Sequence, residues 1–314
     1  MDNLVNVNMD LAPSEKLSEV ISTALGAWIV PWHMKRLTKA EAEADRIKAL
    51  ESAKTEALLA GDEERYQTLS VIGQRVVAKE IKRKENIEKV VEVANQIIKD
   101  EPNVSSEPAN PDWATRFFNI AQDISEVTLQ NLWGRILAGE VKQPNSYSLR
   151  TLDALQNITC EEAQLFEKVA QYVLFDNEYY ILNTSGIKSA DPISCAEIAK
   201  LIEIGFVQPG SLVTRNYHND TGRNREFSIV YGDYVIMVNI PGGTPCLPIP
   251  FYPLTKVGQE LYHLISKKSD DDYLNIIASA YKKADKRVQV RCAKIILMDK
   301  KGNISYNTQT LRVL

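Results

Sequence analysis

The stretch "LQNLWGRILAGE", residues 129–140, is the most strongly patterned dozen residues in the chain. Its apolar side chains recur every three or four positions, as on one face of an α-helix, and Gly139 ends the pattern. The apolar positions are Leu129, Leu132, Trp133, Ile136 and Leu137. Burying a tryptophan on such a stripe is worth about 2–3 kcal/mol. We therefore predict that this helix holds a core together, with Trp133 packed against residues of the following helices such as Leu152, Leu155 and Phe166.

The same stripe has an alternative role as a groove that binds a protein partner. The residues of that groove would be Leu129, Leu132, Trp133 and Ile136. The core interpretation is favoured, because nothing beside Trp133 combines a nucleophile with a base and an apolar helical stripe is the ordinary pattern of a buried face.

Composition bounds the class of protein. The chain has 314 residues, enough for two or three domains, with 44% hydrophobic and 25% charged residues. Its formal charge of −4 gives no overall basic field of the kind that marks many nucleic-acid-binding proteins. Residues 1–13 contain no Lys or Arg, which argues against a secretory signal. The longest apolar stretch, residues 21–32, is shorter than the roughly 20 residues that span a bilayer. We expect a cytoplasmic protein.

Residues suited to catalysis or metal binding are sparse. The four cysteines form no CxxC pair, so neither a metal cluster nor a disulfide framework is expected. None of the three histidines has a ligand-type companion at i+3 or i+4, and the usual phosphate-binding and nucleophile motifs are missing. His218 and Asp220 could form an acid–base pair, but "TRNYHNDTGRNR" favours a polar loop. We expect a non-enzymatic protein with no catalytic residues, metal or cofactor.

The amino-terminal third predicts long helices that self-associate. Residues 14–28 carry an apolar stripe that Pro31 ends or kinks, and a charged, alanine-rich helix follows. The apolar positions of this second helix are Leu37, Ala40, Ala44 and Ile47, spaced as in a helical hairpin or coiled coil. Because these side chains are small, the helix buries little by itself, and a homo-oligomer is predicted. Another long helix is expected from the break at Gly61 to about Asp100.

An alternative for the same region is attachment to a membrane surface. Trp28 and Trp32 lie at the end of an amphipathic helix, and the cations Lys35, Arg36 and Lys39 follow them. Helix packing in a soluble oligomer explains these residues with fewer assumptions.

The domain organisation follows from changes in pattern along the chain. We predict a coiled-coil-like arm over residues 1–100, a proline-rich linker over 101–112, a helical domain over 113–185 and an α+β domain over 186–314. The fold class predicted is therefore mainly α with a carboxyl-terminal α+β region.

The carboxyl-terminal region predicts a winged-helix-like end. A helix capped by Ser194 and Glu197, a hairpin around Gly232-Asp233 and a helix capped by Thr255 follow each other as in that fold. The loop before the hairpin holds four side chains suited to phosphate contacts, namely Arg215, His218, Arg223 and Arg225. Against a nucleic-acid role, the expected recognition helix has Lys200 as its single cation, and winged helices also bind proteins.

Two segments carry a resemblance to a known family. "GAWIVPWHMKRLTKAEAEADRIKA" and "DWATRFFNIAQDISEVTLQNLWGRILAGEVKQPNSYSLRTLDAL" together resemble a bacterial family described as domain of unknown function 2806, over roughly residues 20–175. The resemblance implies no catalytic residues. Families of this kind often lie among prophage and phage-defence genes.

The leading hypothesis is a self-associating interaction protein of the bacterial cytoplasm, active in phage defence or prophage biology, with a protein partner of unknown identity. A nucleic-acid-binding regulator that uses the basic loop at 215–225 is the first alternative. A membrane-associated effector that uses Trp28 and Trp32 is the second.

Overall fold

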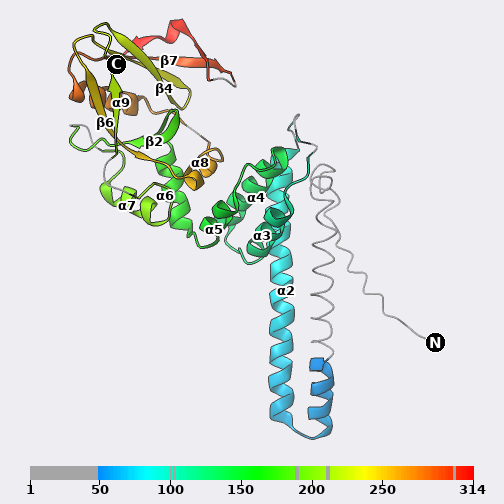
Figure 1. Ribbon diagram of the computed structural model, residues 1–314. Helices are drawn as coiled ribbons and strands as arrows, with labels where there is room; N and C mark the ends of the chain where they lie inside the picture. The colour runs from blue at the N-terminus through cyan, green and yellow to red at the C-terminus, as the bar shows by residue number, and fades with distance from the viewer. Residues whose placement is uncertain are drawn as a thin grey trace. The chain divides into compact units, whose positions relative to one another are not determined.

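The computed structural model describes residues 49–99, 101, 104, 105, 107–187, 191–209, 213–266, 268–299 and 302–314 (Figure 1). The chain divides between Leu152 and Asp153 into two compact units. None of the described helices combines the length and the apolar character that crossing a bilayer requires.

The helices of the first unit follow the order expected from the sequence. Residues 49–59 are helical, and α2 spans Glu63–Ile98, α3 spans Pro111–Ala121, α4 spans Val127–Lys142, and α5, Leu149–Gln156, crosses the division between the units. Asn110 caps α3 by accepting hydrogen bonds from the backbone N–H groups of Asp112 and Trp113. Glu126 caps α4 in the same way for Leu129.

Residues 49–98 form an antiparallel helical hairpin (Figure 1). Gly61, at φ 70°, takes the left-handed conformation that reverses the chain, and Asp62 then caps α2. The helices approach closely at Gly73, where a Cβ atom would lie 2.8 Å from Leu50 Cδ2. The predicted break at Gly61 is confirmed. We call residues 49–98 the helical arm.

Residues 129–140, the most strongly patterned stretch, lie inside the first unit. Trp133 and Ile136 have no exposed surface, and the ring of Trp133 lies 5.2 Å from that of Phe117 in α3. Gly134 faces α2, where an added Cβ would come within 2.5 Å of the Val93 side chain. The absence of a side chain at this position therefore sets how closely α4 approaches α2.

The end of this stretch fixes the turn that follows α4. Glu140 is buried, and its two carboxylate oxygens accept hydrogen bonds from the backbone N–H groups of Asn145, at 2.7 Å, and Tyr147, at 3.1 Å. Gly139 leaves room for the ring of Tyr147, whose Oη would lie 2.5 Å from a Cβ at that position. Gly139 and Glu140 thus determine the path of the backbone after α4.

The second unit contains a nine-stranded antiparallel sheet with helices around it. The strands are β1 Val173–Asp176, β2 Glu178–Leu182, β3 Val213–His218, β4 Arg225–Tyr231, β5 Tyr234–Ile240, β6 Cys246–Pro253, β7 Gln289–Met298, β8 Ile304–Tyr306 and β9 Arg312–Val313. Their order is β3-β6-β2-β1-β4-β5-β7-β8, and β9 also pairs with β7. The helices are α6 Cys160–Ala170, α7 Cys195–Glu203, α8 Lys256–Tyr262 and α9 Asp271–Ala284.

The predicted fold class, mainly α with a winged-helix-like end, is wrong. The fold is α+β, because the predicted hairpin, β4–β5, lies within a nine-stranded sheet. A wing exposes one face to solvent, whereas β5 is covered on both faces. Ile236, Val238 and Ile240 contribute to the core that includes α9, and Val235 and Met237 pack on the opposite side with Ala293.

The structure confirms the local capping and turn patterns predicted for this unit. The capping boxes of Thr159 with Glu162 and of Ser194 with Glu197 are both present, and Thr255 caps α8. The hairpin turn falls at Gly232-Asp233, with Gly232 at φ 54°. The β1–β2 hairpin is not among the predicted elements. Its signal in the sequence is Asn177, at φ 61°, between two apolar runs.

We expect Gly134→Ala to destabilise the protein by about 1–3 kcal/mol, because the new Cβ would also lie 3.0 Å from the Val90 carbonyl oxygen and the backbone cannot easily move away. The clash opposes the intrinsic preference of helices for alanine, which is about 1 kcal/mol. Denaturant unfolding measures the change, with Arg135→Ala as a solvent-exposed control on the same helix. A Gly134→Ala protein more stable than wild type would contradict this close packing.

Candidate functional site

Arg215, one of the four predicted phosphate contacts, is held by groups of its own chain. Its Nη1 donates hydrogen bonds to the backbone carbonyl of Asp176, at 2.8 Å, and to Asp176 Oδ2, at 3.0 Å, while Nη2 donates to Glu178 Oε1. The guanidinium lies 5.0 Å from the ring of Tyr180 and 4.8 Å from the ring of Phe251. Arg215 therefore ties the β1–β2 turn to β3 and β6.

Tyr217, two residues further along β3, completes this cluster. Its hydroxyl donates a 2.7 Å hydrogen bond to Asp176 Oδ2, and its ring stacks on Phe227 of β4 at 3.9 Å. Burial raises the pKa of Tyr217 to about 12, and the negative charge of Asp176 contributes to the rise. Strands β3 and β4, which do not pair directly, are thus joined through side chains.

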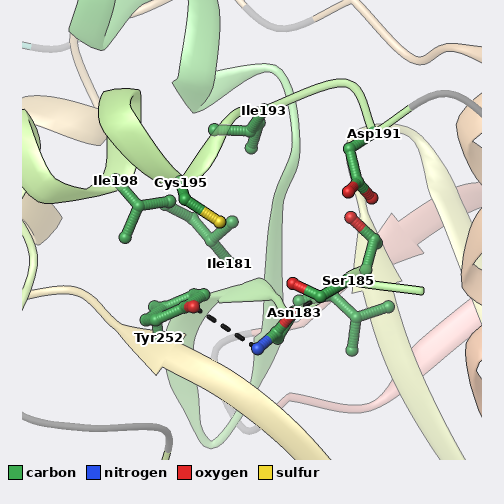
Figure 2. A pocket seen from close by; sticks show the side chains of 10 residues that line it. Ile181, Asn183, Ser185, Asp191, Ile193, Cys195, Ile198 and Tyr252 are labelled. Atoms are coloured by element: carbon green, nitrogen blue, oxygen red, sulfur yellow. Dashed lines mark hydrogen bonds between the residues drawn. The ribbon is translucent and has the colours of Figure 1, made fainter. Parts of the chain in front are cut away.

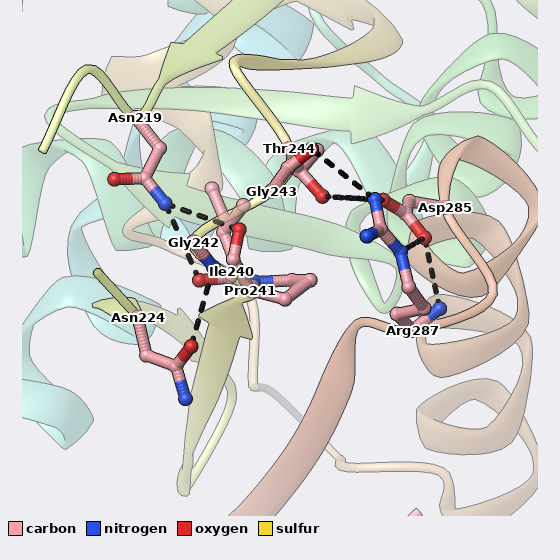
Figure 3. Close-up of polar contacts among 9 residues, drawn as sticks. All are labelled: Asn219, Asn224, Ile240, Pro241, Gly242, Gly243, Thr244, Asp285 and Arg287. Carbon is pink, nitrogen blue, oxygen red and sulfur yellow. Dashed lines mark hydrogen bonds and ion pairs between the residues drawn. The ribbon is translucent and has the colours of Figure 1, made fainter. Parts of the chain in front are cut away.

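Three turns meet at one end of the sheet, and we call them the three-turn surface. They are residues 219–224 between β3 and β4, residues 241–245 between β5 and β6, and residues 285–288 between α9 and β7. Figure 3 shows the polar contacts that link them.

The first two turns are locked together by asparagines and a close backbone approach (Figure 3). Buried Asn219 donates from Nδ2 to the carbonyl oxygens of Arg223, at 2.9 Å, and Pro241, at 3.2 Å. Asn224 Oδ1 accepts a 3.2 Å hydrogen bond from the backbone N–H of Gly242. A Cβ at Gly242 would overlap the carbonyl oxygen of Gly222, so the approach requires glycine.

The third turn is held through Asp285 and Arg287. The Arg287 guanidinium donates to Asp285 at 2.8 and 3.1 Å and to Thr244 Oγ1 at 3.0 Å, and Thr244 also contacts Asp285. Arg287 holds the pKa of the Asp285 carboxyl well below its usual range. A Cβ at Gly243 would lie 3.1 Å from Arg287 Nη1, so this glycine leaves space for the guanidinium beside the turn.

The other predicted phosphate contacts lie on or beside the three-turn surface. His218, Arg223 and Arg225 are all exposed. Arg225 Nη1 donates to the carbonyl oxygen of His218, and no bond within the described residues joins His218 to Asp220. Lys286 and Arg287 are absent from the predicted set, because they lie more than sixty residues further along the chain and reach this surface through the sheet topology.

A separate pocket lies beside α7 (Figure 2). Its volume is only about 20 Å³, and its polar lining includes Asn183, Ser185, Asp191, Cys195 and Tyr252. Asn183 Nδ2 donates to the Tyr252 hydroxyl at 3.3 Å. Burial raises the pKa of Tyr252, and the nearby side chain of Cys195 raises it further. All four cysteines are free thiols, and the described residues contain no cluster of metal-ligating side chains.

Several predicted residues lie outside the part of the chain that the structure describes. They are the proposed self-association positions Leu37, Ala40, Ala44 and Ile47 and the proposed membrane contacts Trp28 and Trp32. Of the predicted groove, Trp133 and Ile136 are buried, and Leu129 and Leu132 are half-buried.

The comparisons with known proteins identify a family without an assigned activity. The family model described as "Protein of unknown function (DUF2806)" matches residues 71–278, which is more than half of the 314 residues. The chain belongs to this family, as the resemblance predicted, and the match continues through much of the sheet. Neither the curated proteins nor the solved structures include a match.

We expect Tyr217→Phe to lower the free energy of unfolding by about 1.5–3 kcal/mol, because it removes a hydrogen bond to a carboxylate and keeps the stacked ring. Denaturant unfolding near neutral pH measures this change. Tyr252→Phe is the matched control, since it removes only a neutral 3.3 Å contact. If the two substitutions lowered the free energy of unfolding equally, the hydrogen bond to Asp176 would contribute no more to stability than the neutral contact.

The protein should also lose stability as the pH rises from 10 towards 12. Burial raises the pKa values of Tyr217 and Tyr231 from 10.0 to about 12, so the folded state favours the neutral phenols. The contribution of these two tyrosines to the free energy of unfolding is complete below pH 10, and it is lost as the pH rises through their pKa values in the folded state. Unfolding followed by circular dichroism, beside tyrosinate absorbance, tests this. The decline should be less steep in Tyr217→Phe, and a flat profile in wild type would contradict it.

Proposed function

We propose that this protein is a non-enzymatic interaction protein that self-associates through its helical arm, residues 49–98. The observation that carries the proposal is the apolar surface left uncovered on the arm. The exposed side chains are Leu58, Leu59, Val71, Ile72, Val77, Ile81 and Ile97, and the exposed fraction reaches 83% at Leu59 and 54% at Ile81. Large apolar residues exposed together along one element are typical of protein contacts.

The geometry of the arm explains why these side chains stay exposed. Among the described residues, the helix over residues 49–59 contacts α2 as far as Gly73, opposite Leu50, and Val77 and Ile81 lie beyond that contact. Val77 and Ile81 are one helical turn apart and therefore share a face of α2. A helix from another copy could cover that face.

A second copy is the partner that the composition of the arm favours. α2 carries nearly equal numbers of acidic and basic residues, with both signs mixed along its length. Two such helices can therefore lie side by side without strong net repulsion and form interhelical ion pairs. An acidic or basic partner would gain no comparable advantage.

The setting that we propose is phage defence or prophage biology in the bacterial cytoplasm, which rests on the gene surroundings of families of this kind. In this proposal, assembly through the arm brings several copies of the second unit together. Multivalent presentation would then strengthen weak contacts with a partner.

We expect the full-length chain to have a mass that is a multiple of the 35.3 kDa monomer in multi-angle light scattering at tens of micromolar. Val77→Ser together with Ile81→Ser should shift the mass towards the monomer, because it removes apolar area from the arm without opening a buried core. Gln74→Ser is the matched control at an exposed polar position of α2. A wild-type protein that remains monomeric would overturn the proposal.

A further inference from the structure

The three-turn surface presents cations that the fold does not use. Within the described residues, the side chains of Arg223 and Lys286 are exposed and form no ion pair or hydrogen bond. They come from turns more than sixty residues apart in the sequence. Exposed cations of this kind do not contribute to packing of the core, so packing alone does not explain why two segments bring them to one surface.

Two arginines from the neighbouring turns lie close to the glycine pair of the middle turn. A Cβ at Gly242 would lie 3.0 Å from Arg223 Cα, and a Cβ at Gly243 would lie 3.1 Å from Arg287 Nη1. Because consecutive Cα atoms are about 3.8 Å apart, both arginines lie near the same dipeptide.

The balance of charge at this surface is positive. The basic groups on the turns or directly beside them are His218, Arg223, Arg225, Lys286 and Arg287, and the acidic groups are Asp220 and Asp285. Asp285 and Arg287 form an ion pair and largely cancel each other's charge, so the remaining basic groups outnumber Asp220, the remaining acid of these turns. The chain as a whole is acidic, at −4, which makes this a local feature.

The surface is also rigid before any ligand arrives. The side chains of Asn219, Asn224 and Thr244 join the turns to each other through hydrogen bonds to backbone or to neighbouring side chains (Figure 3). Because the turns are already fixed, they lose little conformational entropy when a ligand binds, and this favours binding.

We infer that the three-turn surface binds the phosphate backbone of a nucleic acid, through Arg223 and Lys286, with Arg225 and His218 beside them. Arginine guanidinium and lysine ammonium groups are the usual partners of backbone phosphates, and contacts of this kind position a nucleic acid without reading its sequence. Arg215 takes no part, since its guanidinium is held by Asp176 and Glu178. The inference concerns the second unit and does not depend on assembly through the arm.

The test is fluorescence anisotropy of the full-length chain with labelled duplex DNA, single-stranded DNA and RNA of equal length, over a range of salt concentrations. Wild type should bind at least one of them, more weakly as salt rises. Arg223→Ala with Lys286→Ala should weaken binding about tenfold or more near physiological salt. The slope of affinity against salt should fall by about 1 for each phosphate that the variant no longer neutralises.

Arg135→Ala is the matched control, because it removes an exposed arginine of α4 and should leave binding unchanged. Testing the Val77→Ser and Ile81→Ser protein separates this inference from the proposed function, since a monomeric variant should retain the salt-dependent binding of each surface. Salt-independent or absent binding would overturn the inference. So would an equal weakening in the control, or binding to anionic phospholipid vesicles without binding to any nucleic acid.

Discussion

The architecture of the second unit depends on the coverage of β5 on both faces. Residues pointing to one side of this strand join the core with α9, and those pointing to the other side pack with Ala293 of β7. A strand buried in this way needs neighbours at both edges, and β4 and β7 supply them. Once β5 is central, the turns at the ends of β3, β5 and α9 are brought together, and the three-turn surface follows from the sheet.

Close backbone approaches recur where this protein needs rigid geometry. Gly134 sets the approach of α4 to α2, Gly139 admits the ring of Tyr147, and Gly242 lies against the carbonyl of Gly222. In each case a methyl group would occupy space already filled by another residue. Two of these glycines belong to the stretch "LQNLWGRILAGE", whose role is therefore to pack helices and direct the chain out of α4.

Local patterns misjudge the carboxyl-terminal fold because they do not show how many strands a sheet contains. They reveal the hairpin at Gly232-Asp233, but they present β3 as a basic loop and place β1 and β2 in a helical domain. Pairing of β3 with β6 joins residues 213–218 to 246–251, and no short window of sequence contains both. The same limit conceals Lys286 and Arg287 as neighbours of Arg223.

The long helix after the break at Gly61, the capping boxes, the turn at Gly232-Asp233 and the family can all be inferred from the amino-acid sequence, because each depends on residues close together in the chain. The nine-stranded sheet and the opposite environments of Arg215 and Arg223 emerge with tertiary packing, since one guanidinium meets Asp176 and the other meets solvent. Burial and ion pairing are set by partners distant in sequence, which come into contact when the chain has packed into its final fold.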